Sequence, residues 1–342
     1  MYESFYGLTG KPFQLNPDPA FFFGSRGHKR AYAYLQYGVY QSEGFIVITG
    51  EIGAGKTTIV RSLFEHLDSD KVVAAQLVST QLDADDMLRA VGIAYGLPVR
   101  TVNKAILLGS LEAFLCKLAT ENKRALLIVD EAQNLTPKAI EELRMLSNFQ
   151  LEDKALLQSF LIGQPELRAM MQGPKMQQLR QRIIASYHLG PLDKEETRAY
   201  IEHRLKHVGW NGDPEFDPVC FDRIYELTGG IPRRINTLCN RLMLAGFLAE
   251  KHRLDSEDVE AIEREIRDEL GPDGRSGHAT DAHAAASAHP RAPVNGDDLQ
   301  AQFRKIEDRL DRLDKTLSVA LDLLHGMLHS ETVNKPGSTA GR

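Results

Sequence analysis

The sequence contains no apolar run long enough to cross a membrane as a helix. Its longest apolar stretches, Phe45–Thr49 and Ala125–Val129, have the length of buried strands, far short of the roughly 20 residues that a spanning helix needs. The first residues, Met1–Phe5, are aromatic and acidic and lack the basic and then apolar layout of a signal peptide. We therefore expect a cytoplasmic protein that reaches the inner membrane only through partners, if at all.

Cysteines are few, and basic residues are not in excess. The 342 residues include three cysteines, Cys116, Cys220 and Cys239, which are far apart and fall in apolar helical patterns. This favours reduced core cysteines over a disulfide framework or a metal site. The chain has 47 Asp and Glu residues against 41 Lys and Arg residues, and its formal charge of −6 argues against a protein that coats nucleic acid. A local basic patch would still be compatible with this balance.

Short runs rich in β-branched residues alternate with helical patterns from Phe45 onward. Such alternation predicts an α/β fold, in which a mostly parallel sheet is sandwiched by helices. Beyond about Lys194 the strand signal stops and helical periodicity continues to Leu270, which predicts a small all-helical domain. The five predicted strands are Phe45–Thr49, Val72–Val78, Ala125–Val129, Leu157–Ile162 and Ala185–Leu189.

The C-terminal part of the sequence changes character twice. Residues 271–297 are dominated by Gly, Pro, Ala, Ser and His and hold too few apolar side chains to fold, so we expect a disordered linker. Over residues 298–330, apolar side chains recur at alternating spacings of four and three, which is an a/d heptad seam. The seam favours a coiled coil, with a second copy or with a partner, over packing back onto the body. We expect a disordered tail over residues 331–342.

The segment Gly50–Thr57, Gly-Glu-Ile-Gly-Ala-Gly-Lys-Thr, follows an apolar strand and precedes a helical pattern. Its glycines allow successive backbone N–H groups to point at phosphates, and the helix adds its positive end. Lys56 would reach the β- and γ-phosphates, and the Thr57 hydroxyl would complete the shell of a Mg²⁺ ion. The sequence therefore predicts a P-loop that binds ATP with Mg²⁺. The predicted nucleotide-binding residues are Gly50, Glu51, Ile52, Gly53, Ala54, Gly55, Lys56, Thr57 and Thr58.

A second apolar strand ends in two carboxylates, Asp130 and Glu131. In a P-loop protein Asp130 would hold Mg²⁺ together with Thr57, while Glu131 would polarise the attacking water. The alternative is a capping pair before the helix that starts at Pro137. An acidic residue next to the metal carboxylate favours hydrolysis of the nucleotide over nucleotide sensing alone.

Two further positions are candidates for reporting the state of the nucleotide. The strand Leu157–Ile162 is followed by Gly163-Gln164-Pro165, which would place Gln164 beside the γ-phosphate. In the small domain, Gly-Gly-Ile-Pro precedes Arg233 at the start of a helix, so Arg233 could move over the phosphates and couple the nucleotide state to the domain angle.

Two arginines lie just before the fifth strand. A predicted helix, Lys175–Ile184, carries Arg180 and Arg182. An arginine there could enter a neighbouring subunit's site and stabilise the charge of the transition state. A solvated helix face explains either arginine equally well.

The order of these elements resembles the AAA+ ATPases. More narrowly, residues 1 to about 268 look like the general secretion pathway protein A family. The segments that carry this resemblance are Phe5-Tyr6-Gly7-Leu8, Pro12-Phe13, Gly44-Phe45, Asp130-Glu131-Ala132-Gln133-Asn134-Leu135, Gly163-Gln164-Pro165-Glu166-Leu167 and Gln181-Arg182-Ile183. The resemblance implies an ATPase that works as a ring or other oligomer with an envelope export or assembly system. It also implies a helical lid over residues 194–270, after a lead-in over residues 1–43 and a nucleotide-binding domain over residues 44–193.

The resemblance assigns catalytic roles to five positions. Lys56 and Glu131 act at the phosphates and at the water, and Gln164 takes the sensor position. Arg182 is the expected arginine finger, with Arg180 as the alternative, and Arg233 is a second sensor on the lid.

One departure from the family narrows the expectation. Longer members continue into a transmembrane helix and a periplasmic peptidoglycan-binding region, in place of which this sequence has the linker and the heptads. That layout, with Ser79-Thr80-Gln81-Leu82-Asp83, looks like the ATPases associated with exosortase and exopolysaccharide loci. Two other functions stay open: a DNA-associated ATPase of the helicase-loader or transposition type, and a scaffold whose coiled coil changes partner with the nucleotide.

Overall fold

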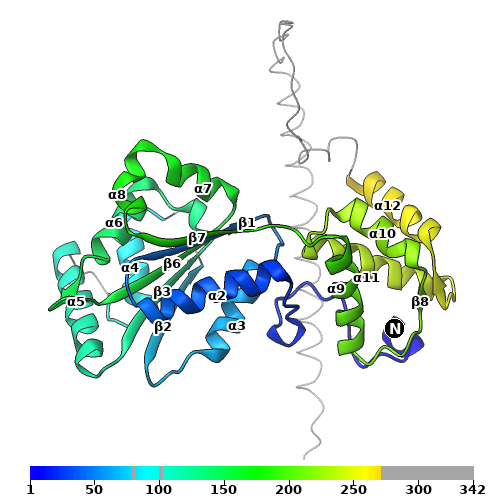
Figure 1. Ribbon diagram of the computed structural model, residues 1–342, viewed down its shortest axis with the longest axis horizontal. Coiled ribbons are helices and arrows are strands. Elements are labelled where there is room, and N and C mark those ends of the chain that lie inside the picture. Colours follow the sequence, from blue (N-terminus) through cyan, green and yellow to red (C-terminus); the bar gives the residue numbers. More distant parts are fainter. Residues whose placement is uncertain (79–81, 100–102, 271–342) are drawn as a thin grey trace, which may run out of the picture. The chain divides into compact units, whose positions relative to one another are not determined.

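The computed structural model of the chain describes residues 1–78, 82–99 and 103–270 (Figure 1). The predicted linker (271–297), coiled coil (298–330) and tail (331–342) lie outside the described residues. So does Ser79-Thr80-Gln81 of the stretch that resembles the exosortase-associated ATPases. Within the described ranges, no helix is both long and apolar enough to span a bilayer.

A five-stranded parallel sheet forms the centre of the α/β domain, as the sequence predicts. Its strand order is β2-β3-β6-β1-β7, so β1, which leads into the P-loop, has a neighbour on each side. The carboxyl ends of β1, β3 and β6 therefore meet at one edge of the sheet. The strands are β1 (Phe45–Gly50), β2 (Val72–Val78), β3 (Arg124–Asp130), β6 (Leu157–Gly163) and β7 (Ile183–Leu189).

Helices cover both faces of the sheet because alternate residues of the central strands point to opposite sides (Figure 1). Ile46 and Ile48 of β1 pack with α2 and α3, while Phe45 and Val47 pack with the helices of the other face. The first face carries α2 (Arg26–Gln41) and α3 (Lys56–His66). The second carries α4 (Ala84–Ala94), α5 (Lys104–Thr120), α6 (Pro137–Leu146) and α7 (Pro165–Gln172).

The segment before β7 differs from the predicted helix Lys175–Ile184. The structure has a 3₁₀ turn, η3 (Pro174–Met176), and a single helical turn, α8 (Gln177–Arg180). Ile183 already pairs with Phe45 in the sheet, so the β-branched pair Ile183-Ile184 ends the helix early. A short hairpin, β4 (Gln150–Leu151) and β5 (Lys154–Ala155), was also not predicted.

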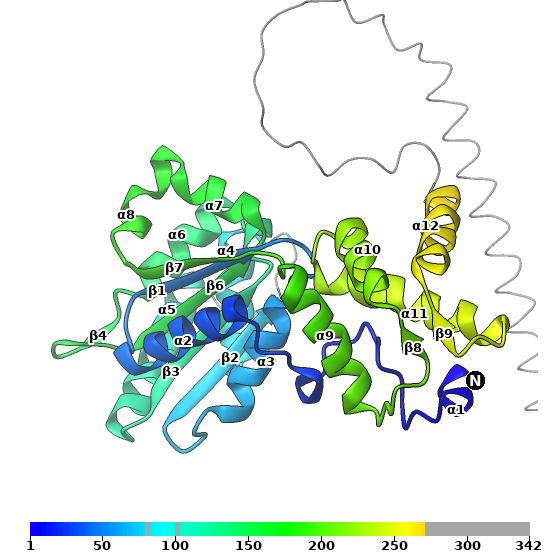
Figure 2. The same cartoon turned by 45° about the vertical axis from the view of Figure 1, so that its right-hand side comes forward.

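The lid contains four helices and a two-stranded ribbon (Figure 2). The ribbon is a departure from the all-helical prediction, because Glu215 and Phe216 pair with Arg253 and Leu254. The helices are α9 (Lys194–His207), α10 (Pro218–Thr228), α11 (Pro232–Leu248) and α12 (Ser256–Leu270), and the ribbon strands are β8 (Glu215–Phe216) and β9 (Arg253–Leu254).

The first 25 residues pack with the lid and then return to the α/β domain. Tyr2, Tyr6 and Phe13 are buried in the apolar core of the lid, near the short helix α1 (Tyr2–Phe5). The chain then forms a 3₁₀ turn, η1 (Pro19–Phe21), which contacts both α3 and α9 (Figure 2). The N-terminal segment therefore lies between the P-loop helix and the first helix of the lid.

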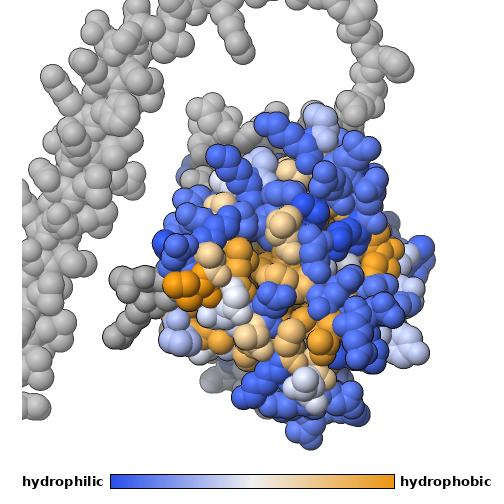
Figure 3. All heavy atoms as spheres, turned by 90° about the vertical axis from the view of Figure 1, so that its left-hand side faces the viewer, coloured by the Kyte–Doolittle hydropathy of each residue, from blue (hydrophilic) through white to orange (hydrophobic). Residues whose placement is uncertain are grey.

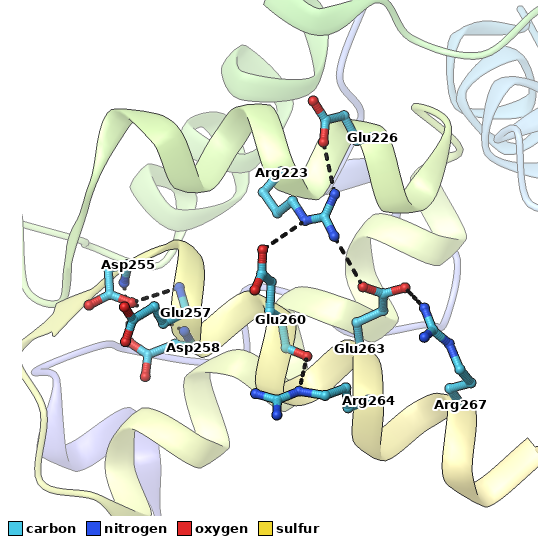
Figure 4. A network of polar contacts seen from close by, with 9 residues as sticks. All are labelled: Arg223, Glu226, Asp255, Glu257, Asp258, Glu260, Glu263, Arg264 and Arg267. Carbon is cyan, nitrogen blue, oxygen red and sulfur yellow. Dashed lines mark hydrogen bonds and ion pairs between the residues drawn. The ribbon is translucent and has the colours of Figure 1, made fainter.

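A charged network ties α10 to α12 at the surface of the lid (Figure 4). The Arg223 guanidinium contacts Glu226 on its own helix at 3.0 Å, and Glu260 and Glu263 on α12 at 3.6 and 3.4 Å. Partly exposed pairs of this kind contribute little individually, and two of the three link Arg223 of α10 to α12, beside the apolar core that both helices enter.

Apolar side chains gather on an outer face of the α/β domain. Figure 3 shows this face, on the side where α5 and α8 lie in Figure 1, with apolar patches among charged residues. Two large aliphatic side chains of α4 and α5, Ile93 and Ile106, are 65% and 62% exposed.

Candidate nucleotide site

The P-loop adopts a conformation that requires glycine at two positions. Gly53 and Gly55 have φ angles of 82° and 96°, in the left-handed region. A Cβ atom on Gly53 would lie 2.3 Å from the Cβ of Arg233, and one on Gly55 would lie 2.7 Å from Nε2 of His28. The loop is therefore held between the lid on one side and α2 on the other.

Lys56 is the first residue of α3 and is only 6% exposed. Its Nζ donates to the carbonyl oxygens of Gly50 and Glu51, at 2.7 and 3.0 Å, which holds the ammonium group across the loop. Burial lowers its pKa, while the negative charges of Glu131 and Asp130 act in the opposite direction. The ammonium is thus a buried cation that anionic phosphates would stabilise.

Asp130 and Thr57 bring two oxygen ligands together at the edge of the sheet. Asp130 ends β3 and is 4% exposed, and one of its carboxylate oxygens accepts a 3.1 Å hydrogen bond from the Thr57 hydroxyl. Burial raises the pKa of the Asp130 carboxyl, which means that a nearby cation would stabilise its charged form. A hydroxyl and a carboxylate are hard oxygen donors, so this pair fits the Mg²⁺ predicted from the sequence.

Glu131 carries the second carboxylate and is held by two amide side chains. Gln133 and Gln164 each donate from Nε2 to Oε2 of Glu131, at 2.6 and 3.0 Å. Burial alone would raise the pKa of Glu131, but these hydrogen bonds and the charge of Lys56 lower it. Glu131 also adopts a left-handed backbone conformation, with φ of 52°. Its carboxylate is therefore ionised and fixed in place.

Gln133 is a site residue for which we predicted no role from the sequence, although it lies within the Asp-Glu-Ala-Gln motif. While its Nε2 donates to Glu131, its Oε1 accepts a 3.0 Å hydrogen bond from the backbone N–H of Gln164. It thus joins the ends of β3 and β6. The predicted sensor, Gln164, is brought to Glu131 at this junction.

A cavity of about 410 Å³ lies in front of the P-loop. Its volume is within the range of small-molecule sites. Lys56, Thr57 and Glu131 line it on one side, while the N-terminal segment and the lid form the other walls. The lining residues for which no role was predicted include Phe21, Phe22, Phe23, His28, Tyr200, Arg204 and Asn236.

The lid touches the P-loop at Arg233. The backbone N–H of Arg233 donates to the carbonyl oxygen of Gly53 at 3.1 Å, and its side chain lines the cavity. Pro232 and Arg233 begin α11 as the sequence predicts. The positive N-terminal end of this helix therefore faces the same cavity as the P-loop.

His28 supports the P-loop from behind. Its Nε2 lies 3.0 Å from the carbonyl oxygen of Ala54, and its Nδ1 lies 2.6 Å from the Ser25 hydroxyl. Because a carbonyl can only accept, Nε2 carries the proton and Nδ1 accepts from Ser25. Burial lowers the pKa of His28, against the effects of the Ala54 carbonyl and of Glu196. The imidazole is thus a neutral donor that orients the carbonyl of Ala54.

Arg180 and Arg182 do not reach the cavity of their own chain. Arg182 lies just before β7, and its carbonyl oxygen accepts from the backbone N–H of Phe45, the first residue of β1. Since β1 is six residues long, Arg182 and the P-loop lie at opposite ends of this strand, about 20 Å apart. Its guanidinium donates to the backbone and hydroxyl oxygens of Ser147, both at 3.0 Å. Arg180 donates to the backbone carbonyl oxygens of Met171, in the last turn of α7, and of Gly173, just after it. Either arginine would need a second copy of the chain to act at a nucleotide.

Comparison with known proteins agrees with this geometry. Residues 39–171 match a family described as an AAA domain. Over 273 residues, 79% of the chain, the sequence is 38% identical to general secretion pathway protein A of Aeromonas hydrophila. The chain spans about half the length of this curated relative, since the match covers 50% of it.

Solved structures with the same fold include two origin recognition proteins of Aeropyrum pernix. The ORC2 protein in ADPNP and ADP complexes is 19% identical with a TM-score of 0.57, over 75% of this chain and 71% of that one. The ORC1 protein in complex with DNA is 16% identical with a TM-score of 0.52, over 70% of this chain and 64% of that one. The predicted P-loop AAA fold is thereby confirmed.

Proposed function

We propose that this AAA domain binds ATP with Mg²⁺ and hydrolyses it to ADP and phosphate. The observation that carries the proposal is the meeting of Lys56, Thr57, Asp130 and Glu131 at the carboxyl edge of the sheet, three of them in the wall of one cavity. The residues come from two segments, the start of α3 and the end of β3, and Thr57 and Asp130 are 73 residues apart in sequence. A structural capping role for the two carboxylates would not require a buried ammonium beside them.

The side chains divide the chemistry among them. Lys56 and the amides of the loop bind the phosphates, and Thr57 and Asp130 would hold Mg²⁺, which neutralises phosphate charge when bound. The ionised Glu131 accepts a hydrogen bond from the attacking water and would take up its proton as the water oxygen bonds to the γ-phosphorus. The bond between the γ-phosphorus and the bridging oxygen breaks, and ADP leaves with that oxygen. Gln133 and Gln164 keep the Glu131 carboxylate oriented for this step.

The same proposal makes the active form a homo-oligomer. Arg182 lies at the opposite end of β1 from the P-loop, so a neighbouring copy would have to receive it. The exposed apolar side chains of α4 and α5 offer a surface for such contacts, and Arg233 would close the site from the lid of the same chain. In this arrangement hydrolysis and lid position are coupled across a ring or partial ring.

The cellular role that we propose is to drive or regulate the assembly of an envelope export system. Its support is the 38% identity to general secretion pathway protein A over most of the chain. The narrower assignment to an exosortase or exopolysaccharide system rests on the sequence layout and on residues 79–83. The heptads of residues 298–330 would capture the partner, and attachment at the inner membrane would follow from that partner.

A comparison of ATP turnover with and without duplex DNA tests the export role against the DNA-associated alternative. The fold is shared with an origin protein solved on DNA, but the acidic chain lacks an excess of basic residues. We expect ATP turnover to change by less than about twofold when DNA is added at moderate salt. At that salt concentration a protein surface that binds DNA phosphates would still bind the duplex. Strong stimulation by DNA would overturn the export role and favour a DNA-associated motor.

A further inference from the structure

Arg204 of α9 is a buried cation in the wall of the cavity. It is 6% exposed, and in the part of the chain that the structure describes it has no ion pair. Its guanidinium donates to the carbonyl oxygens of Pro12 and Gln14, at 2.6 and 3.2 Å, and to the Tyr200 hydroxyl at 2.8 Å. The guanidinium also lies 4.8 Å from the centre of the Phe21 ring. This one side chain of the lid thus holds the N-terminal segment at two of its carbonyl oxygens.

The guanidinium determines the direction of the next hydrogen bonds. An arginine can only donate, so the Tyr200 oxygen accepts from Arg204 and must give its own proton to another acceptor. That acceptor is Oδ1 of Asn236, at 2.9 Å. Burial raises the pKa of Tyr200, against the effects of Arg204 and Asn236, so the phenol keeps its proton at neutral pH.

The chain of hydrogen bonds from Arg204 through Tyr200 to Asn236, called the relay below, fixes the orientation of the Asn236 amide. Because Oδ1 faces Tyr200, the NH₂ group takes the other side of the amide, and Asn236 lines the cavity with 6% of its surface exposed. Turning the amide by 180° would place its NH₂ group against the Tyr200 hydroxyl and leave the phenol proton without this acceptor, so the hydrogen-bond network favours Oδ1 toward Tyr200. In this orientation the NH₂ group is the end of the amide that is left to donate to a molecule in the cavity.

Asn236 lies beyond the phosphate end of the cavity. It follows Arg233 by three residues on α11, so it lies about 4.5 Å further along the helix from the contact with Gly53. Tyr200, its partner, packs against Phe23 with ring centres 5.7 Å apart. The amide thus belongs to the aromatic wall, where a planar base would find apolar surface.

We propose that the Asn236 amide donates a hydrogen bond to a ring nitrogen of the nucleotide base, and that Tyr200 and Arg204 are positioning residues that aim it. The inference rests on the nucleotide binding proposed above. Adenine suits this donor because its ring nitrogens N1, N3 and N7 are all acceptors. An aspartate at position 236 would still accept from Tyr200. Its second carboxylate oxygen could not donate to the ring nitrogens, which are themselves acceptors.

Calorimetric titration of the full chain with MgATP tests the role of Asn236. We expect about three- to tenfold weaker affinity for Asn236→Ala, the loss of one hydrogen bond, and a larger loss for the nearly isosteric Asn236→Asp. The matched control is Asn240→Ala, one turn further along α11, where the side chain accepts from Tyr2 and does not line the cavity. Unchanged affinity in Asn236→Ala, with wild-type protein that binds ATP, would overturn the inference and leave the proposed function standing.

Tripolyphosphate with Mg²⁺ separates the base from the phosphates. We expect Asn236→Ala to bind this probe as tightly as the wild type does, because the probe has no base. An equal loss for ATP and tripolyphosphate would overturn the assignment to the base. Failure of the wild type to bind either probe would instead overturn the proposed nucleotide binding itself.

A double-mutant cycle on ATP affinity tests the relay. Tyr200→Phe keeps the ring and removes the hydroxyl, so the amide is no longer aimed, and we expect a loss close to that of Asn236→Ala. In the Asn236→Ala background the same change should have an effect of less than about twofold. Additive losses would show that Tyr200 does not act through Asn236, and melting curves of the four proteins identify any loss due to unfolding.

Discussion

Replacing His28 tests whether the P-loop depends on its support from α2. His28 is 6% exposed and joins the Ser25 hydroxyl to the carbonyl oxygen of Ala54, directly behind Gly55. His28→Ala would remove both hydrogen bonds and leave a space behind the loop. From these losses we expect the free energy of unfolding to fall by about 2–4 kcal/mol at pH 8.

The pH dependence gives this prediction a specific signature. Because burial lowers the pKa of His28 in the folded protein, the unfolded chain takes up a proton first as the pH falls below about 6.5. The stability due to the neutral imidazole is therefore complete above that pH and is lost as the pH falls further, by at most about 1.4 kcal/mol per pH unit. His28→Gln retains a side-chain donor but does not titrate. It should therefore lack this slope, and at pH 8 it should lose less stability than His28→Ala does.

Chemical denaturation between pH 5 and 8 measures both quantities. The matched control is His66→Ala, since the His66 ring donates to the Ser62 carbonyl within its own helix and does not contact the loop. The difference in unfolding free energy between wild type and His28→Gln should shrink as the pH falls from 7 to 5. A difference that is constant over this range would refute the neutral, buried state of His28.

Three further predictions concern catalysis and assembly. Gln133→Leu should lower ATP turnover about tenfold or more with little change in ATP affinity, because it loosens Glu131 but does not touch the phosphate-binding residues; steady-state kinetics check this. Arg182→Ala should lower turnover while ATP affinity is kept, whereas Arg180→Ala should change turnover by less than about twofold; restoration of turnover by mixing Arg182→Ala with Lys56→Ala protein would show that the arginine acts in trans. Removal of residues 297–330 should leave basal hydrolysis and abolish self-association or partner capture, and unchanged sedimentation and pulldown would contradict the coiled-coil role.

Much of the sheet and the local geometry of the P-loop could be predicted because both depend on local patterns. The β-branched runs give the five strands, and Gly50–Thr57 encodes its own turn and helix start. Asp130 and Glu131 then follow from their place at the end of a buried strand, since parallel strands bring their carboxyl ends to one edge. The positive φ angles of Gly53 and Gly55 agree with this reading.

The second wall of the cavity could not be predicted in the same way. Pro12 and Arg204 are separated by 192 residues, and no periodicity reports that such segments touch. The aromatic side chains near Phe21 are visible in the sequence, but an apolar core explains them as well as a binding wall does. Gln133 lies in the motif that follows Asp130, yet its role depends on Gln164, which only the folded sheet brings beside it.

The predicted helix over Lys175–Ile184 was too long because helical propensity competed with sheet pairing. Ile183 pairs with Phe45, so the sheet takes the residues that a local pattern assigned to the helix. This outcome changes how Arg182 can act. It lies at the start of a strand rather than on an exposed helix face, and its position is set by the sheet.

The most direct test of the central claim is the identity of the nucleotide that remains bound after one round of reaction. Wild type and Glu131→Gln are incubated with MgATP, separated from free nucleotide, and denatured, and the released nucleotide is identified by chromatography. We expect mainly ADP in the wild type and mainly ATP in Glu131→Gln, with no nucleotide retained by Lys56→Ala. Equal amounts of ADP in wild type and Glu131→Gln would contradict the role of Glu131 in hydrolysis.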